Sequence, residues 1–284
     1  MDSYTRRPSS IYGDGMQIII ITRIEDPRIR EYAEELSHHL IQAGHDVFCG
    51  PENLQEEGKP LFNPDLPPDL VVVVGGDGTI LLTTQRMPVQ VPVVGVNWGE
   101  VGFLADLEPE EAFGFFDQLP VHVRTEDRMR VRLSVDGSYV GDALNEALIV
   151  TDRPAKMLKF LIHIDGVVAE RFRADGLLIS TPTGSTAYGM SAGGPIVDPK
   201  VEAFLIIPLA PFMLSNRPHL IDSSRTVKIT LEAEKPAKLV IDGLIVRHIG
   251  EMSTIDVSRS SHPALFVDAG KNFFEKINRK LRHL

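Results

Sequence analysis

Residues 69–79 read DLVVVVGGDGT, and this stretch indicates how the front of the chain folds. Its continuous apolar run has the length of a β-strand and is typical of a strand buried on both faces of a parallel sheet. Glycines follow at once, and residues 80–86 then have the composition of a helix. The stretch therefore predicts a buried strand, a tight glycine turn and a helix.

The same alternation of strand and helix surrounds this stretch. Residues 16–22 (MQIIIIT) and 92–96 predict two further buried strands, and residues 46–49 a short one. Residues 26–44 begin with Asp-Pro, a helix start signal, and end with glycine, a helix stop signal. Residues 108–119 predict one more helix. Repeated units of this kind favour a Rossmann-like α/β domain with a parallel sheet.

The pattern changes after about residue 120. Apolar residues then alternate along the chain, and Asp136-Gly137 and Asp165-Gly166 are typical hairpin turns. Strands are predicted at residues 130–135, 139–150, 159–164, 167–172, 177–180, 204–207, 226–231, 239–241, 254–257 and 265–267. This half of the chain favours an all-β sandwich domain.

The sequence thus predicts two domains and a short extension. Residues 1–15 are polar and are interpreted as a flexible N-terminal extension. Residues 16–120 form an α/β phosphate-binding domain, completed by a helix within residues 270–284. Residues 121–269 form the all-β domain. The basic residues of the final helix are expected to be a solvated face near the negative end of the helix dipole; they are Lys271, Lys276, Arg279, Lys280 and Arg282.

Charge and composition restrict the class of protein. Lys and Arg number 29 against 39 Asp and Glu, which gives a net charge of −10. That sign disfavours nucleic acid and anionic membranes as partners. The single cysteine, Cys49, fits a reducing compartment, and no apolar run reaches the length of a membrane span. We therefore expect a cytoplasmic protein with neither nucleic acid nor membrane as a partner.

The glycine turn, residues 75–79, has the composition of a phosphate-binding loop. Glycines let a phosphate approach the backbone closely, and amides at a helix start favour an anion. Asp77 would repel a phosphate, unless it accepts a proton from an attacking hydroxyl or helps to hold Mg²⁺. On these residues alone, a phosphate site and a plain strand–helix turn stay equally open.

Three other segments carry polar groups beside core-type residues. Residues 171–195 concentrate hydroxyl side chains and glycines behind an apolar strand, which favours a binding loop over a polar surface loop. Asn145-Glu146 interrupts a strand-like run and either binds a ligand or faces solvent. Residues 95–104 form either a loop over a nucleobase or a bend with Phe103 in the core.

Five motifs in fixed order carry a family resemblance. They are GGDGT at 75–79, GVNWGEVGFL at 95–104, Asn145-Glu146, DGLLISTPTGSTAYGMSAGGP at 175–195 and Asp242-Gly243. The set resembles the ATP–NAD kinase family and extends from about residue 16 to the final helix. GGDGT is shared with lipid kinases and phosphofructokinases of the same superfamily, whereas STPTGSTAY with SAGGP is far more specific.

The resemblance implies transfer of the γ-phosphoryl group of ATP to the adenosine-ribose 2′-hydroxyl of NAD⁺, giving NADP⁺ and ADP. Mg²⁺ or another divalent cation would be carried mainly by the nucleotide phosphates, with no metal site on the protein. The final helix would return to the front domain, and the chain would assemble as a homodimer or homotetramer. Preference for ATP, another nucleoside triphosphate or polyphosphate stays open, as does acceptance of NADH.

The same resemblance implies the residue roles. Asp77 would be the base that activates the hydroxyl. Asn145 and Glu146 would hold NAD hydroxyl groups, and Phe103 would lie by a base. The full set of implied nucleotide-binding residues is Gly75, Gly76, Gly78, Thr79, Phe103, Asn145, Glu146, Lys156, Arg173, Asp175, Thr186, Ala187, Tyr188, Gly189, Met190, Ser191 and Ala210.

Three alternatives remain. A lipid kinase would share GGDGT but would need a membrane-facing surface. A phosphofructokinase-like sugar kinase would need a basic pocket for a sugar phosphate. A non-catalytic sensor would bind NAD or NADP without turnover, and the presence of Asp77 argues against it.

Overall fold

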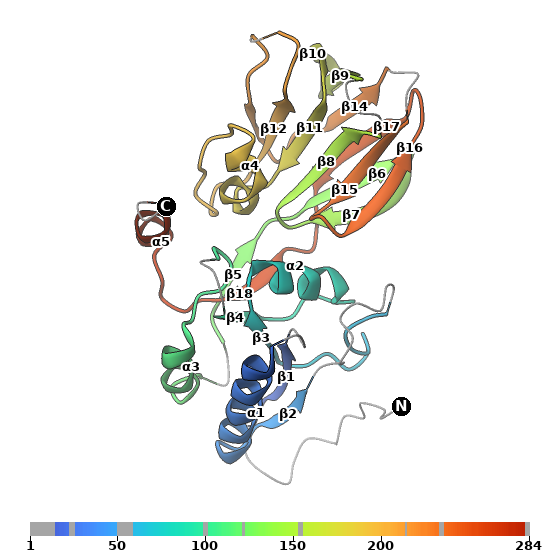
Figure 1. Ribbon diagram of the computed structural model, residues 1–284. Coiled ribbons are helices and arrows are strands. Elements are labelled where there is room, and N and C mark those ends of the chain that lie inside the picture. Colours follow the sequence, from blue (N-terminus) through green and yellow to red (C-terminus); the bar gives the residue numbers. More distant parts are fainter. Residues whose placement is uncertain are drawn as a thin grey trace. The chain divides into compact units, whose positions relative to one another are not determined.

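The computed structural model describes residues 15–22, 26–49, 59–98, 102–120, 123–152, 156–213, 215–232 and 236–281 (Figure 1). The chain divides into two compact units. Unit 1 comprises Met1–Asp127 and Ala264–Leu284, and unit 2 comprises Arg128–Pro263. The predicted extension at residues 1–15 lies outside the described residues, apart from Gly15.

Unit 1 is built on a six-stranded sheet in the order β2-β1-β3-β4-β18-β5. The pairs β1–β2, β1–β3, β3–β4 and β4–β18 are parallel. The strands are β1 (Gln17–Thr22), β2 (Asp46–Cys49), β3 (Leu70–Gly75), β4 (Val93–Asn97), β5 (Thr125–Arg128) and β18 (Ala264–Val267). The helices are α1 (Pro27–Gln42), α2 (Asp77–Arg86), α3 (Pro109–Phe116) and α5 (Phe273–Leu281).

The strand order of unit 1 creates a natural ligand position. The chain leaves β1 for β2 on one side and returns to β3 on the other, so the order reverses between β1 and β3. Open α/β sheets bind ligands at the carboxyl ends of strands beside such a reversal. All six residues of β3 are buried, and the glycine turn follows its carboxyl end. The fold therefore places residues 75–79 where the sheet favours a ligand.

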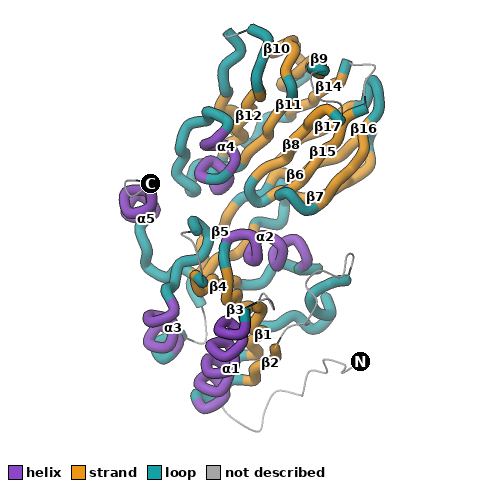
Figure 2. Tube along the Cα trace, viewed as in Figure 1, coloured by secondary structure: helices purple, strands orange, loops and turns teal. Residues whose placement is uncertain are grey.

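Unit 2 consists of two six-stranded sheets with antiparallel pairing, in the orders β10-β9-β14-β17-β6-β7 and β13-β12-β11-β8-β15-β16. Strands dominate this unit, and α4 is a short helix within it (Figure 2). Its elements are β6 (Val131–Val135), β7 (Ser138–Ala143), β8 (Glu146–Thr151), β9 (Leu158–Ile164), β10 (Val167–Ala174), β11 (Gly176–Ser180), η1 (Thr183–Thr186), α4 (Tyr188–Ser191), β12 (Ala203–Leu209), β13 (His219–Asp222), β14 (Val227–Leu231), β15 (Ala237–Ile241), β16 (Ile245–Ile249) and β17 (Thr254–Arg259).

The core of unit 2 lies between its two sheets. Phe160 and Ile229 from one sheet and Leu177 and Leu239 from the other belong to one cluster of buried side chains. Strand β11 is buried on both faces, because a second cluster that includes Leu178 and residues of β12 packs on its other side. The predicted fold class, an α/β domain followed by an all-β sandwich, is confirmed.

Several element boundaries differ from the sequence predictions. Helix α2 begins at Asp77 rather than at residue 80, so the aspartate is the first residue of the helix. The predicted strand 139–150 is divided into β7 and β8. Strands β5, β13 and β16 were not predicted, because they are short edge strands with weak alternation.

The domain boundaries at 120 and 269 also differ from the division between the units. Strands β5 and β18 belong to the sheet of unit 1, whereas residues 265–267 were predicted as part of the all-β domain. Sheet membership depends on pairing between residues distant in sequence, which local patterns do not carry. The final helix is α5, which lies in the part of the chain assigned to unit 1.

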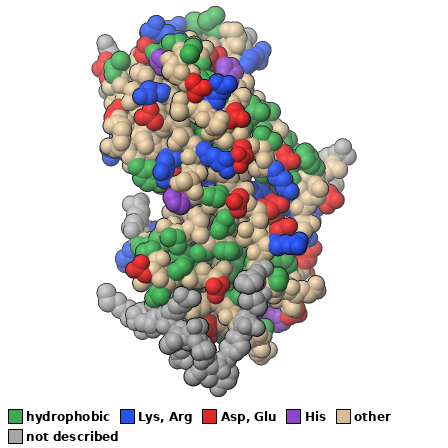
Figure 3. Space-filling model, turned by 180° about the vertical axis from the view of Figure 1, so that it is seen from behind, with side chains coloured by type: hydrophobic (Ala, Val, Ile, Leu, Met, Phe, Trp, Pro, Cys, Tyr) green, Lys and Arg blue, Asp and Glu red, His purple; other side chains and the backbone are tan. Residues whose placement is uncertain are grey.

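The surface is charged and mixed. Acidic and basic side chains are interspersed over the face drawn in Figure 3, so the net charge of −10 is not gathered into one acidic patch there. Among the described residues, no helix combines the length and the apolar composition that crossing a membrane requires.

Candidate functional site

The glycine turn joins β3 directly to α2. Gly76 is the residue before the helix, and Asp77 and Gly78 occupy the first turn, where backbone amides lack intrahelical partners. A Cβ atom at Gly76 or Gly78 would meet nothing within 4 Å, so open space adjoins the backbone at both. A Cβ at Gly75 would lie 2.9 Å from Thr79 Oγ1. The turn thus offers amides and space to an anion, the combination that helix N-termini use for phosphate.

The Asp77 carboxylate is held by three consecutive backbone amides. Oδ2 accepts the N–H of Phe103 at 2.6 Å, and Oδ1 accepts those of Leu104 at 3.0 Å and Ala105 at 3.4 Å. Gly102 completes this arrangement, because a Cβ atom there would overlap Asp77 Oδ1. The segment that starts at Gly102 therefore fixes the orientation of the carboxylate, and residues 99–101 before it lie outside the described residues.

Helix α5 places two lysines near this carboxylate. Lys276 forms an ion pair with Asp106, and both side chains are largely buried, with 14% and 13% exposed. The Lys280 ammonium lies over the Phe103 ring, 4.8 Å from its centroid. Burial, and then the charge of Lys280, lower the pKa of Lys276 to about 8, while the charge of Asp77 opposes that shift. The lysines are therefore part of the surroundings of Asp77.

The predicted solvated face of α5 is thus wrong for Lys276 and Lys280. It fits Lys271 and Arg279 better, since they pair with Glu111 at 2.8 Å and Glu108 at 2.6 Å on the exposed side. Arg282 lies outside the described residues. The sequence did carry a signal: Lys276 and Lys280 follow Phe273 at helical spacing, where an amphipathic helix would continue its inner stripe.

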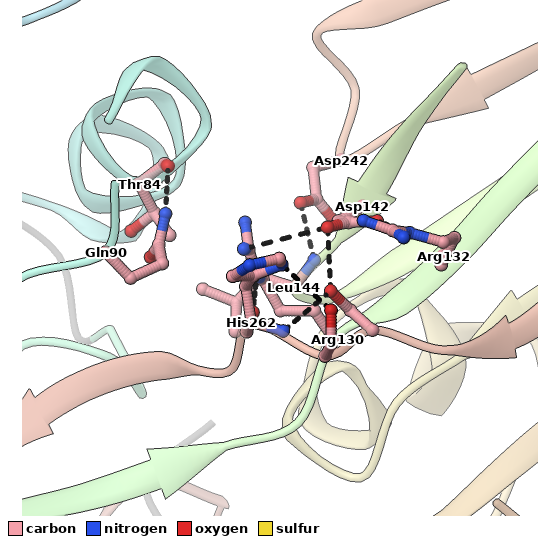
Figure 4. A network of polar contacts seen from close by, with 10 residues as sticks. Thr84, Gln90, Arg130, Arg132, Asp142, Leu144, Asp242 and His262 are labelled. Atoms are coloured by element: carbon pink, nitrogen blue, oxygen red, sulfur yellow. Dashed lines mark hydrogen bonds and ion pairs between the residues drawn. The ribbon is translucent and has the colours of Figure 1, made fainter. Parts of the chain in front are cut away.

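In unit 2, Asp242 organises the break between β7 and β8. Its buried carboxylate accepts the backbone N–H of Leu144 at 2.8 Å, of Asn145 at 2.8 Å and of Glu146 at 3.0 Å. Figure 4 shows Asp242 directed at Leu144. The residue occupies the turn between β15 and β16 with a φ of 49°. One aspartate therefore sets the backbone of the Asn145-Glu146 pair.

The residues after β11 pack onto the same break. Thr181 Oγ1 donates to the Leu144 carbonyl at 2.6 Å, and its backbone N–H donates to the Asn145 carbonyl at 2.9 Å. The Gly184 N–H in turn donates to Thr181 Oγ1 at 3.0 Å. A Cβ at Gly184 would overlap the Asn145 carbonyl oxygen. Hydroxyl groups and glycine in residues 181–184 are thus required by close backbone contact with Asn145.

The pKa of the Glu146 carboxyl group is strongly shifted. Burial, and then the charge of Asp242, raise its pKa from 4.5 to about 7. Its Oε2 atom is buried and has no hydrogen-bond partner within the described part of the chain. A buried polar atom without a partner costs free energy, so it marks a position where a ligand hydroxyl would be favourable.

The remaining predicted binding residues form two groups. Thr186, Ala187, Tyr188, Gly189, Met190 and Ser191 lie in η1, α4 and their junction, beyond the end of β11 that pairs with Glu146. Gly189 is in close contact with this loop, since its Cβ would lie 2.9 Å from the Gly184 carbonyl oxygen. The structure therefore brings this group to the same strand end as Asn145 and Glu146.

The second group lies at the other end of β11. Asp175 donates its N–H to the Leu209 carbonyl at 3.0 Å, beside Ala210 with its φ of 45°. Arg173 covers the Phe212 ring at 4.2 Å, and Lys156 lies two residues before the strand that pairs with β10. Strand spacing puts the two ends of β11 about 13 Å apart. Lys156, Arg173, Asp175 and Ala210 are thus not gathered around Asn145.

A buried ion cluster supports β7 just before the break. Asp142 accepts Arg132 Nε at 3.2 Å and the Ser260 hydroxyl at 2.7 Å, and Arg130 lies 3.7 Å away (Figure 4). Arg130 Nε donates to the His262 carbonyl at 2.7 Å. Burial lowers the pKa of Arg130, while the charge of Asp142 opposes this. The cluster, which the sequence did not reveal, links β6, β7 and the segment after β17.

The chemistry of these groups is that of anion and hydroxyl binding. Among the described residues, no group of three or more His, Cys, Asp or Glu side chains is arranged to hold a metal ion. Unit 1 supplies helix-start amides, a fixed carboxylate and two lysines. Unit 2 supplies the buried Glu146 Oε2, which has no hydrogen-bond partner among the described residues, on a backbone held by Asp242. These are groups that phosphoryl transfer and ribose recognition both use.

Comparison with known proteins assigns the family. The model of the ATP-NAD kinase N-terminal domain matches residues 65–121, and that of the ATP-NAD kinase C-terminal domain matches residues 144–269. An NAD kinase of Methanospirillum hungatei is 68% identical over 269 residues, covering 95% of this chain and all of the relative. An NAD kinase of Methanoculleus marisnigri is 57% identical over 271 residues, with the same coverage of 95% and 100%.

Two solved structures agree. An NAD kinase from Archaeoglobus fulgidus in complex with ATP has a TM-score of 0.75 at 29% identity, covering 95% of this chain and all of that chain. A yeast NADH kinase complexed with NADH has a TM-score of 0.82 at 27% identity, covering 96% of this chain and 89% of that chain. The chain therefore belongs to the ATP–NAD kinase family and is an NAD kinase.

Proposed function

We propose that the chain transfers the γ-phosphoryl group of ATP to the 2′-hydroxyl of the adenosine ribose of NAD⁺, forming NADP⁺ and ADP. Family membership supports the overall reaction. The observation that carries the detail is the Asp77 carboxylate, which is fixed by three amides at the start of α2, beside a glycine turn suited to phosphate.

In this proposal Asp77 is the general base. Its carboxylate takes the proton of the 2′-hydroxyl as the oxygen forms a bond to the γ-phosphorus, and the bond from that phosphorus to the β–γ bridging oxygen breaks. ADP leaves with the electron pair of the broken bond. Such transfer depends on alignment and on charge neutralisation more than on covalent help from the protein. Three amide contacts on one carboxylate serve that alignment.

The glycine turn is proposed to cradle the phosphates. Gly75, Gly76 and Gly78 let the backbone approach, and Thr79 supports the turn from within α2. We propose that Mg²⁺, or another divalent cation, arrives with the donor phosphates, whose oxygens are hard ligands that suit it. When bound, the ion would neutralise phosphate charge, and its positive charge would tolerate the nearby Asp77 carboxylate.

The nucleotide-binding roles remain proposals as well. Asn145 and the unpartnered Oε2 of Glu146 would bind NAD hydroxyl groups, and Phe103 would lie by a base. The residues proposed to contact bases and carboxamide are Asp175, Thr186, Ala187, Tyr188 and Ser191. Gly189 and Met190 are proposed to bind the nucleotide as well. Lys156, Arg173 and Ala210 are proposed to add contacts at the other end of β11.

Two broader features are proposed from the resemblance. The chain would act in the cytoplasm and would assemble as a homodimer or homotetramer. Sedimentation equilibrium of the purified protein measures the second: a monomer at all concentrations would contradict it.

The function is tested with purified protein, Mg²⁺, ATP and NAD⁺, using an NADP-specific dehydrogenase to detect the product. Formation of NADP⁺ is expected. Polyphosphate in place of ATP tests the other donor. NAD⁺ binding without turnover by any donor would favour a sensor, and phosphorylation of lipid vesicles or of a sugar phosphate instead would favour the other kinases of the superfamily.

Gly102→Ala is expected to lower kcat about 100-fold, because the new methyl group displaces the Asp77 carboxylate and small misplacements of a reacting group have effects of that size. Gly114→Ala is the matched control, since a Cβ there meets nothing within 4 Å. Steady-state kinetics of both variants measure the effect. Equal kcat values would show that the fit of Gly102 against Asp77 does not matter for the reaction.

Glu146 is expected to make stability depend on pH. Its pKa is about 7 in the folded state and 4.5 ordinarily, so the folded protein binds the extra proton between these values. The contribution of this group to stability is fully present below pH 4.5 and is lost as the pH rises through 7. Glu146→Gln removes the ionisable group. The difference in free energy of unfolding between this variant and the wild type should therefore shift in favour of the variant by about 2–3 kcal/mol from pH 5 to pH 8.

Urea unfolding at several pH values measures this difference. Glu251→Gln is the control, because Glu251 lies in an exposed turn. A constant difference between Glu146→Gln and the wild type across the same range would contradict the raised pKa.

A further inference from the structure

A pocket lies beside α5 in unit 1, outside the glycine turn itself. Its volume is about 190 Å³, and its lining includes Ala105, Asp106, Lys276 and Lys280. Ala105 is also one of the residues whose amides hold the Asp77 carboxylate. Through Ala105, the pocket therefore adjoins the segment that holds the Asp77 carboxylate.

The lining of the pocket carries four basic side chains, Lys271, Lys276, Arg279 and Lys280, and three acidic ones, Asp106, Glu108 and Glu275. Lys276 pairs with Asp106, Lys271 with Glu111 and Arg279 with Glu108. Within the described part of the chain, Lys280 has no carboxylate at ion-pair distance. Its ammonium lies instead over the ring of Phe103, and the amide of that same residue donates to Asp77.

The surroundings of the two lysines also disfavour their charged forms. Burial lowers the pKa of both Lys276 and Lys280, and the charge of Lys280 lowers the pKa of Lys276 further. Asp77 opposes the shift for both, but its carboxylate is already held by three amides. Two partly desolvated ammonium groups, whose charge the neighbouring carboxylates Asp77, Asp106 and Glu108 offset only in part, favour the binding of a further anion.

We propose that Lys280, supported by the buried Lys276, binds the terminal phosphates of the phosphoryl donor. This inference rests on the proposed function, because a base and the phosphorus that its hydroxyl attacks must lie within reach of the same oxygen. Lysine is a compact point charge that suits phosphate, and charge on the transferring group must be neutralised. The pyrophosphate of NAD⁺ is a chemically similar anion. We favour the donor phosphates because the reaction requires the γ-phosphorus, and not that pyrophosphate, to lie beside the hydroxyl that Asp77 deprotonates.

Lys280→Met tests the inference, because methionine keeps an apolar stem over Phe103 and removes the charge. Lys280→Arg restores a charge, and Lys228→Met, an exposed lysine paired with Asp256 in unit 2, is the matched control. Three quantities are measured: kcat with both KM values, the Kd for ATP and for inorganic tripolyphosphate by calorimetry, and the melting temperature.

Lys280→Met is expected to raise KM and Kd for ATP about tenfold or more, the loss typical of a charged hydrogen-bonding partner, and to weaken tripolyphosphate binding equally. KM for NAD⁺ should stay within about twofold, and Lys280→Arg should recover part of the ATP affinity. The control should match the wild type. Equal losses of affinity for ATP and for tripolyphosphate would establish that Lys280 binds the triphosphate rather than the adenosine.

Unchanged ATP and tripolyphosphate binding in a folded Lys280→Met protein would overturn the proposal, as would a rise in KM for NAD⁺ alone. If Lys280→Met melts far below the wild type, Lys280→Gln and Lys280→Arg provide the same comparison. Binding and turnover separate the two claims. A wild type that binds tripolyphosphate through Lys280 but forms no NADP⁺ refutes the proposed function only, whereas normal NADP⁺ formation by Lys280→Met refutes this inference only.

Discussion

Replacing Asp77 with Asn is expected to lower kcat for NADP⁺ formation by about 10³–10⁴-fold, the upper range for loss of a general base. The amide cannot take the proton of the attacking hydroxyl. Its NH₂ group would also face amide donors, since three backbone N–H groups converge on the present carboxylate. The Kd for NAD⁺ should stay within about twofold, because binding and proton transfer are separate contributions.

Steady-state kinetics and calorimetry of the variant measure both quantities. Asp69→Asn is the matched control, because Asp69 stands at the other end of β3, where its carboxylate accepts the Gln17 N–H at 2.8 Å. The control should keep wild-type kcat. An Asp77→Asn enzyme with more than about a tenth of wild-type kcat would contradict the role of a base.

Asp242→Asn is expected to lower the free energy of unfolding by about 2–5 kcal/mol, because three N–H donors, two of them in buried hydrogen bonds, lose a charged acceptor. The same change frees the backbone of Asn145 and Glu146, so KM for NAD⁺ should rise about tenfold or more. Loss of the Asp242 charge should also move the pKa of Glu146 back toward 4.5. Urea unfolding and steady-state kinetics measure the first two effects.

Asp136→Asn provides a matched control. Asp136 also begins an Asp-Gly hairpin turn with a positive φ, 50° against 49° for Asp242, and its carboxylate accepts the Thr254 N–H at 2.8 Å. Asp136 is exposed, so its replacement should lower the free energy of unfolding by less than about 1 kcal/mol and leave KM unchanged. Equal effects of the two variants would mean that Asp242 is an ordinary turn residue.

Local patterns predicted much of the fold. The run at residues 69–79 predicted β3, the turn and a helix, and the two Asp-Gly turns predicted the hairpins β6–β7 and β9–β10. These features depend on neighbours in sequence, which is why spacing and turn chemistry reveal them. The start of α2 at Asp77 was missed, because Gly-Asp-Gly is a poor helix sequence.

The parts that escaped prediction depend on long-range contacts. Asp242 and Asn145 are 97 residues apart, and Arg130 meets the carbonyl of a residue 132 positions away. Lys280 reaches Phe103 only because α5 belongs to unit 1. On sequence alone, a lysine on a terminal helix is indistinguishable from a solvated one. Motifs therefore named Asp77, Asn145, Glu146 and Asp242, while the contacts among these residues and their neighbours required the structure.

The most direct test of the account follows the phosphoryl group itself. Wild-type protein is incubated with Mg²⁺, NAD⁺ and ATP labelled at the γ-phosphorus, and the labelled product is offered to a dehydrogenase that accepts only the 2′-phosphorylated dinucleotide. All of the label transferred to NAD⁺ is expected in a product that this dehydrogenase reduces. Label in a dinucleotide that the dehydrogenase does not reduce, or no transfer of label to NAD⁺, would contradict it.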